Sequence, residues 1–266
     1  MLIIDDSNFH QYQPSLTPEN RHAFGLVPRN THPTFAKQRC YGAADIPLIP
    51  WAEIPDRIAD LERRKASLWH IWNDSEVGVL NQSSLSYCHA FSAVMGVKID
   101  RVVRGLPYIE LSASSVGAPV TGYRNAGAWI LEDLEQMRKV GVATTEYVPM
   151  LTTRRGDFKA GWEQSAARHK VLEWSELESR NLHQQICALL SLKVTCNGLN
   201  YWGHAVTDLA VKDLDPSKRP DDESRYGILF LNSWGDDWGD RGCAVRAGRQ
   251  KYVDEAYLVE SVTLSI

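Results

Sequence analysis

Three residues far apart in the chain have the types and the order that thiol-based acyl transfer requires: Cys88, then His204, then Asn232. The cysteine stands where a helix is predicted to begin, and a helix N-terminus or a nearby imidazolium stabilises a thiolate. An asparagine amide holds an imidazole in one tautomer and orientation. Gln82, six residues before the cysteine, offers an amide N–H to a developing oxyanion, beside the backbone N–H of Cys88. We therefore predict a nucleophile, a base, an orienting group and an oxyanion donor.

The strongest local motif is Asn-Ser-Trp-Gly-Asp-Asp-Trp-Gly-Asp-Arg-Gly, over residues 232–242, directly after an apolar run at 226–231. A tight turn with aromatic packing would account for its two Trp-Gly steps. That interpretation gives no reason for an Asn before the first Trp, or for a Cys and a His upstream. The motif therefore favours a catalytic site.

Taken together, these motifs resemble those of the papain-like cysteine peptidases, the peptidase C1 type, over roughly residues 45–250. In that family a Gln precedes the nucleophilic Cys by six residues, and a His and an Asn-Ser-Trp-Gly motif follow much later. The positions that match are Gln82, Cys88, His204 and Asn232. The Asn lies at the family's usual distance from the Cys, and the His lies somewhat closer.

The resemblance implies an endopeptidase in which a Cys88 thiolate attacks a peptide or protein substrate and forms an acyl-enzyme. Asn125-Ala126-Gly127 is similar to the family's Asn-Gly-Gly, so Gly127 would offer its backbone to an extended substrate. Trp234 would shield the Asn232–His204 hydrogen bond. The resemblance implies no cofactor and no metal.

The sequence also departs from the family pattern around the nucleophile, which is preceded by Leu85, Ser86 and Tyr87 and followed by His89. Leu85 replaces a cysteine that forms a disulfide in secreted members. Ser86 replaces a glycine of the cleft, and we expect Ser86 and Tyr87 to crowd the substrate subsites. His89 replaces a tryptophan and would be a second imidazole beside the nucleophile that could be mistaken for the catalytic base.

Composition excludes several other classes of protein. The chain has 266 residues and a formal net charge of −4, which gives no electrostatic reason to bind nucleic acid. No apolar run approaches the roughly 18–20 residues of a membrane span. The first residues, Met-Leu-Ile-Ile-Asp-Asp, lack the basic start of a signal peptide. Five cysteines without a CxxC pair predict no disulfide framework. We expect a cytoplasmic or virion-associated protein.

The elements that must position these residues follow from hydrophobic periodicity. The pattern predicts helices near 58–65, 88–102, 128–140 and 175–189, strands at 205–211 and 226–231, and a hairpin loop at 213–225. Helices precede strands, so we predict an α+β fold of two unlike lobes, which the resemblance makes papain-like. The domain would span 45–266, with a helical lobe at about 80–150 and an antiparallel β lobe at about 151–266, to which 45–79 contributes. The active site would lie between them.

Residues 1–44 are rich in Asn, Gln, His, Pro and Thr, and we expect an extended arm rather than a domain. The arm is too short and irregular to resemble the family's helical pro-segment. We expect it to be held on its own domain or in a homo- or hetero-oligomeric assembly. Three functions stay open: an active peptidase, an assembly protein such as a virion component with a dormant or maturation-only site, and acyl transfer to a partner. A cleft filled by Tyr87 or by residues 1–44 would favour the assembly role or a zymogen-like state.

Overall fold

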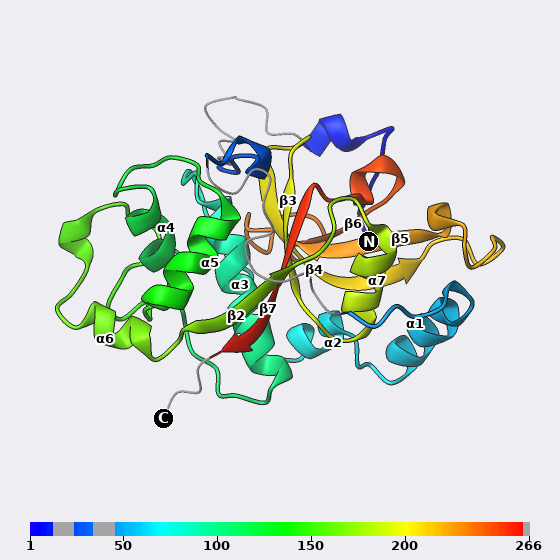
Figure 1. Ribbon diagram of the computed structural model, residues 1–266, viewed down its shortest axis with the longest axis horizontal. Helices are drawn as coiled ribbons and strands as arrows, with labels where there is room; N and C mark the ends of the chain where they lie inside the picture. Colours follow the sequence, from blue (N-terminus) through cyan, green and yellow to red (C-terminus); the bar gives the residue numbers. More distant parts are fainter. Residues whose placement is uncertain (13–23, 34–45, 263–266) are drawn as a thin grey trace.

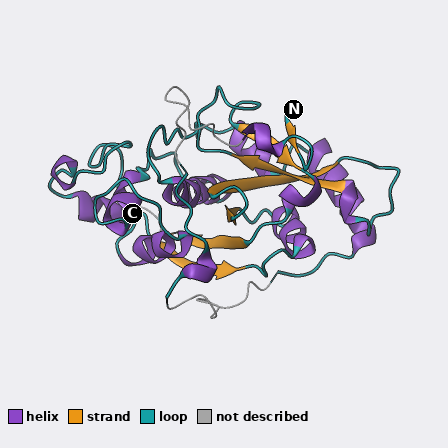
Figure 2. Ribbon diagram, turned by 90° about the horizontal axis from the view of Figure 1, so that it is seen from above, coloured by secondary structure: helices purple, strands orange, loops and turns teal. Residues whose placement is uncertain are grey.

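The computed structural model describes residues 1–12, 24–33 and 46–262, and only the backbone of 260–262. Helices α3 to α6 lie together on one side of the molecule, called the helical side below, and the strands lie on the other, called the sheet side (Figure 1). Viewed from above, helices stand at both ends of the molecule and strands run between them (Figure 2). Predicted arm residues 13–23 and 34–44 lie outside the described part.

The helical side is built around α3 (Cys88–Val103), with α4 (Ser114–Val120), α5 (Ile130–Lys139) and the short α6 (Trp162–Ala167) beside it. Helix α3 is buried almost all round, which is the pattern of a central core helix. It packs against α5 on one side and against strand β4 of the sheet on the other. The residue at its first turn therefore lies where the helical side meets the sheet side.

The sheet has seven strands among the described residues, in the order β1-β6-β5-β4-β3-β7-β2. Neighbouring strands are antiparallel except for β1, which runs parallel to β6. The strands are β1 (Ile3–Ile4), β2 (Val171–Glu176), β3 (Thr195–Leu199), β4 (His204–Asp213), β5 (Tyr226–Leu231), β6 (Cys243–Arg246) and β7 (Glu255–Val262). The predicted α+β class is confirmed, as are the strands at 205–211 and 226–231 and the loop between them.

Three further helices lie on the sheet side, namely α1 (Ile54–Arg63), α2 (Leu68–Asn73) and α7 (Leu182–Leu190). The helix predicted over 175–189 is wrong in its first part. Residues 171–176 form β2, in which Trp174 is buried against β7. The helix begins only after Asn181, whose side chain accepts a hydrogen bond from the N–H of Gln184. That N-cap is the local signal for the true start.

Candidate active site

Cys88 is the first residue of α3, and its side chain is completely buried. Burial raises the pKa of the thiol to about 12, although backbone N–H groups of Ala205, Gly25 and His89 act in the opposite direction. Ala205 directly follows His204, so the thiol lies against the start of β4. The structure thus brings the predicted nucleophile of the helical side to the predicted base of the sheet side.

His204 begins β4, and Asn232 follows the end of β5, the strand paired with β4. The Asn232 Oδ1 atom lies 2.7 Å from His204 Nε2 and also accepts the N–H of Ser233 at 2.8 Å. Because Ser233 donates to this atom, it is the amide oxygen, and His204 Nε2 must carry the proton. His204 Nδ1 is then the basic nitrogen of the ring, as a general base requires.

Trp234 covers this hydrogen-bonded pair. Its ring centroid lies 4.7 Å from that of His204, and the side chain is 5 % exposed. Trp202 adds a second aromatic ring at 5.4 Å from the imidazole. The Asn232–His204 hydrogen bond therefore lies in an apolar, largely dry environment, where hydrogen bonds are stronger than in water.

Gln82 connects the loop before the nucleophile to the sheet side. Its Oε1 accepts from Ser233 Oγ at 2.5 Å, and its Nε2 donates to the Leu85 carbonyl at 2.7 Å. Its backbone N–H donates to the Ser233 carbonyl at 2.8 Å. The side chain is completely buried, and one of its two amide hydrogens is committed to Leu85. Ser233 is thus a residue of the site that sequence reasoning missed, because only its place in the Asn-Ser-Trp-Gly motif was visible.

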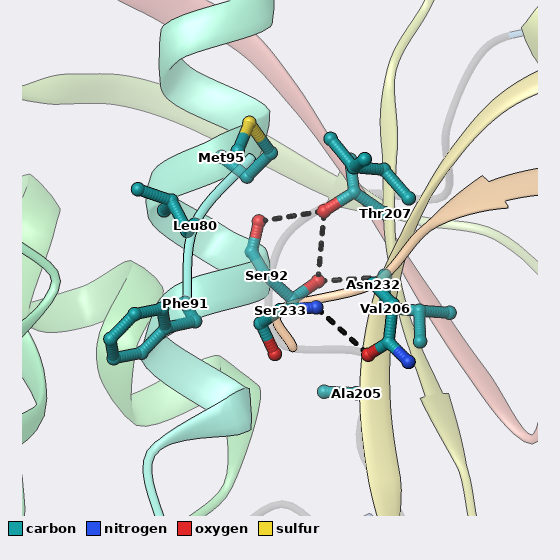
Figure 3. A pocket seen from close by; sticks show the side chains of 10 residues that line it. Leu80, Phe91, Ser92, Met95, Ala205, Val206, Thr207, Asn232 and Ser233 are labelled. Carbon is teal, nitrogen blue, oxygen red and sulfur yellow. Dashed lines mark hydrogen bonds between the residues drawn. The ribbon is translucent and has the colours of Figure 1, made fainter. Parts of the chain in front are cut away.

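Behind the pair, α3 meets β4 and β5 at a cavity of about 10 Å³, close to the lower limit for one water molecule. Its lining includes Ser92, Thr207, Asn232 and Ser233 (Figure 3). Ser92 Oγ donates to the Val206 carbonyl at 2.7 Å. This bond joins the nucleophile's helix to the histidine's strand, which keeps the two in register.

The other polar residues around the nucleophile lie away from it. His89 Nδ1 lies 2.6 Å from Asp133 Oδ2, and both side chains are fully buried between α3 and α5. Tyr87 is also fully buried; it packs on Gly117 of α4, and its hydroxyl donates to the Arg124 carbonyl at 2.8 Å. His89 is thus a buried partner of Asp133, and Tyr87 packs into the helical side instead of filling the cleft.

The chain's own residues 24–28 cross the site at the thiol, where the backbone N–H of Gly25 hydrogen-bonds Cys88. The Gly25 carbonyl accepts the N–H of Ala128 at 2.9 Å, and the N–H of Val27 donates to the Ala128 carbonyl at 3.0 Å. On the opposite wall, the N–H of Leu26 donates to the Gly203 carbonyl at 3.3 Å. Segment 24–28 therefore binds to both walls of the site as an extended peptide. Sequence reasoning gave this arm no precise location, because its polar composition carries no periodicity.

Gly25 and Gly127 allow this close approach of backbones. A Cβ on Gly25 would lie 1.8 Å from the Ser86 carbonyl oxygen, and a Cβ on Gly127 would lie 2.5 Å from the Gly25 carbonyl oxygen. Neither position has room for a side chain while segment 24–28 is in place. Asn125 supports the same wall, because its side chain hydrogen-bonds the backbone of Ser84 and Ser86. Gly127 thus lies against segment 24–28, but the backbone groups that hydrogen-bond this segment are those of Ala128, and the substrate-binding role of Gly127 stays a prediction.

Within the described residues, no cluster of His, Cys, Asp and Glu could hold a metal ion. The four cysteines of this part, Cys88, Cys187, Cys196 and Cys243, form no disulfide. Cys40 lies outside it. No helix in the described ranges is long and apolar enough to cross a membrane.

Comparisons with known proteins find the fold but no sequence relative. Neither the protein-family models nor the curated proteins give a match. Among solved structures, xylellain, a cysteine protease from Xylella fastidiosa, is similar at a TM-score of 0.62 and 14% identity, over 93% of this chain and 99% of that one. Digestive procathepsin L 3 of Tenebrio molitor larval midgut is similar at 0.61 and 14% identity, over 89% and 75%.

The cysteine protease and lectin-like domains of Cwp84 from Clostridium difficile are similar at a TM-score of 0.56 and 16% identity, over 71% of this chain and 50% of that one. All three proteins are described as cysteine proteases or their precursors, and their common element with this chain is the arrangement of helices and strands. The chain therefore has the papain-like cysteine peptidase fold.

Proposed function

We propose that the protein is a papain-like cysteine endopeptidase that its own residues 24–28 keep latent. One observation carries the proposal. Cys88 begins a buried helix beside an oriented His204–Asn232 pair, and the backbone of Gly25 fills the space above the thiol. A dormant scaffold would not need a histidine whose tautomer is fixed by Asn232 so that Nδ1 is the basic nitrogen.

The chemistry begins when segment 24–28 leaves the cleft. Cys88 loses its proton to His204 Nδ1, and the thiolate attacks the carbonyl carbon of a substrate peptide bond. The backbone N–H of Cys88 and the Gln82 amide face the oxyanion that forms. The C–N bond then breaks, and the imidazolium gives its proton to the leaving amine. Water, deprotonated by His204, hydrolyses the thioester and frees the acid product.

The geometry of Gly25 explains why the segment is an inhibitor and not a substrate. The segment meets the thiol through the Gly25 N–H, and the Gly25 carbonyl points to Ala128. Attack requires sulfur to approach a carbonyl carbon within about 3–3.5 Å along the right direction. An amide hydrogen directed at sulfur prevents that approach, so the bonded segment persists intact.

The same contacts indicate the class of substrate. Ala128 offers both its N–H and its carbonyl, and Gly203 offers a carbonyl on the other wall. A chain in extended conformation satisfies all three groups. Leu26 is only 7 % exposed, so the cleft accepts an apolar side chain at this point. We propose extended peptides with an apolar residue near the scissile bond as substrates.

The test is alkylation of Cys88 by an epoxide affinity probe, followed by peptide mass spectrometry. Gly25→Ala opens the cleft, and Cys88→Ser in the same background removes the nucleophile. We expect stoichiometric labelling at Cys88 and hydrolysis of unfolded casein by Gly25→Ala, and neither by the double variant. An opened cleft, seen as lost amide protection at Ala128, without labelling would overturn the proposal. That result would favour the alternative, an assembly protein such as a virion component on the same fold.

A further inference from the structure

Arg29 leaves the cleft directly after segment 24–28 and reaches two acidic residues at the edge of the sheet. Its Nη1 lies 2.6 Å from Glu176 Oε1 at the end of β2, and the two side chains are 20% and 7% exposed. Its backbone N–H hydrogen-bonds the carboxylate of Glu255, the first residue of β7. Through Arg29, the segment that covers Cys88 is connected to the sheet side.

Glu255 is unusual for an acidic residue, because it is only 2 % exposed. Its Oε2 accepts the Tyr257 hydroxyl at 2.7 Å, whereas its Oε1 is buried and has no hydrogen-bond partner among the described residues. Gly198 of β3 makes room for it, since a Cβ there would lie 2.4 Å from the Glu255 side chain. The fold therefore places a carboxylate in a position where it lacks solvent and is incompletely paired.

The other charged groups nearby compensate its charge only in part. Asp254 accepts the N–H of Asn200 at 2.8 Å and faces Arg180, whose Nη1 is 3.4 Å from Asp254 Oδ1 at the exposed side. Glu176 adds negative charge and raises the pKa of Glu255 further, and Tyr257 and Arg29 lower it. Burial is the largest influence and raises the pKa of Glu255 to about 7. A cavity of about 280 Å³ adjoins Arg29, Asp254 and Glu255.

We propose that Glu176 and Glu255 form a guanidinium-binding site, that Arg29 occupies it, and that this contact holds segment 24–28 over Cys88 and weakens in acid. The inference rests on the proposed function only for its consequence, the release of an active thiol. The site itself is an electrostatic latch between the arm and the sheet. Its ligand class is an arginine side chain in an extended peptide, because a planar guanidinium meets a carboxylate with directed N–H groups.

The direction of the pH effect follows from linkage. With Arg29 in place, its positive charge lowers the pKa of Glu255 to the value of about 7; once Arg29 departs, that pKa rises. The open form therefore binds protons more readily than the closed form. The latch stabilises the closed form fully at a pH above the pKa that Glu255 has in the open form. This stabilisation is lost as the pH falls through about 7, the pKa of Glu255 in the closed form. Acidification below neutrality thus shifts the chain toward the open form.

A second contact of the arm does not involve Glu255. His32 Nε2 lies 3.6 Å from Glu132 Oε1 on α5, and its ring packs at 4.7 Å from that of Trp129. Glu255→Gln removes the charge at the latch and leaves this contact unchanged, so it tests the latch alone.

The experiment measures hydrogen exchange of the full chain between pH 5.5 and 8.5, as protection factors for the amides of Ala128 and Leu26. Amides within α3 serve as the internal reference for global unfolding. We expect the wild-type protection at Ala128 to fall about tenfold on acidification. Arg29→Gln is expected to lose the same protection already at pH 8.5, while the α3 amides keep theirs. Glu255→Gln is expected to flatten the pH profile, and Arg180→Gln, the matched arginine control, to match wild type.

Wild-type protection in Arg29→Gln at pH 8.5, or an unchanged pH profile in Glu255→Gln, would overturn the latch. Exchange needs no catalysis, so this result is independent of the proposed function. If Arg29→Gln opens the cleft and Cys88 is still not labelled, the peptidase proposal fails and the latch stands. If Cys88 is labelled in Gly25→Ala and Arg29→Gln stays closed, the latch fails and the peptidase stands.

Discussion

Gly25→Ala is the substitution that tests latency most directly, because one methyl group meets an immovable neighbour. The added Cβ would lie 1.8 Å from the Ser86 carbonyl oxygen and 2.3 Å from its carbon. Real Cβ atoms essentially never approach within 3.0 Å, so a displacement of more than 1 Å is required. Ser86 cannot yield easily, since its N–H is bonded to Asn125 at 2.7 Å. Segment 24–28 must move instead.

The magnitude follows from the cost of overpacking, which is about 1–3 kcal/mol for one added methyl group in a close-packed site. Because a factor of ten corresponds to about 1.4 kcal/mol, the open population should rise roughly 5- to 150-fold. Gly25 lies on the arm and contributes no side chain to the hydrophobic core, so the midpoint of thermal unfolding should change little. The variant therefore exposes the Cys88 thiol without changing the stability of the fold.

The assay is the second-order rate constant for alkylation of Cys88 by an epoxide probe at a fixed pH. Gly156→Ala is the matched control, because a Cβ there meets nothing within 4 Å and should leave the rate unchanged. A rate in Gly25→Ala equal to that of wild type, with the same unfolding temperature, would refute the reasoning. It would mean that the segment does not limit access to the thiol.

Three further expectations follow from the site. In wild type, burial raises the pKa of Cys88 to about 12, so the rate of its alkylation should keep rising with pH through the alkaline range. In Gly25→Ala the rate should reach its plateau at a lower pH. Coincident pH–rate profiles of the two proteins would contradict this expectation. Asn232→Ala, measured in the open variant, should lower kcat by roughly a hundredfold because His204 loses its orienting partner, and unchanged kcat would count against the assigned role. Asp208→Ala should lower the free energy of unfolding in urea by about 3–5 kcal/mol, because Asp208 and Arg246 form a fully buried ion pair at 2.6 Å, and a loss below 1 kcal/mol would show that pair to be dispensable.

The sequence predicted the candidate site best where the residue types and their spacing both fit the same chemistry. The types and order of Cys88, His204 and Asn232 are visible in the chain. The structure places Cys88 at the start of α3, His204 at the start of β4 and Asn232 directly after the end of β5. Trp234 lies where its motif implied, against the imidazole. These features can be predicted from the sequence because each motif is a short run of neighbouring residues, which can be recognised without knowing the contacts between distant segments.

The parts that sequence reasoning missed depend on contacts between distant segments. The strand at 171–176 has little alternation, and only its pairing with β7 makes it a strand. Gly198 lies in β3, where its lack of a side chain makes room for Glu255, a residue 57 positions away in the chain. Likewise, nothing local to Gly25 indicates that its neighbour in space is the Ser86 carbonyl. A glycine is ambiguous in one sequence, since its role is set by whatever approaches it.

Under the proposed function, the arrangement of the arm also decides how the peptidase would be switched on. Segment 24–28 is part of the chain, so it competes with substrate at an effective concentration of the order of millimolar. It uses the same groups that a peptide substrate would use, the N–H and carbonyl of Ala128 and the carbonyl of Gly203. A substrate present at micromolar levels would need about a thousandfold better binding, roughly 4 kcal/mol, to displace it. Three backbone hydrogen bonds common to both ligands give no such difference. Control must therefore act on the anchors of the arm outside the cleft, and the ion pair of Arg29 with Glu176 is such an anchor.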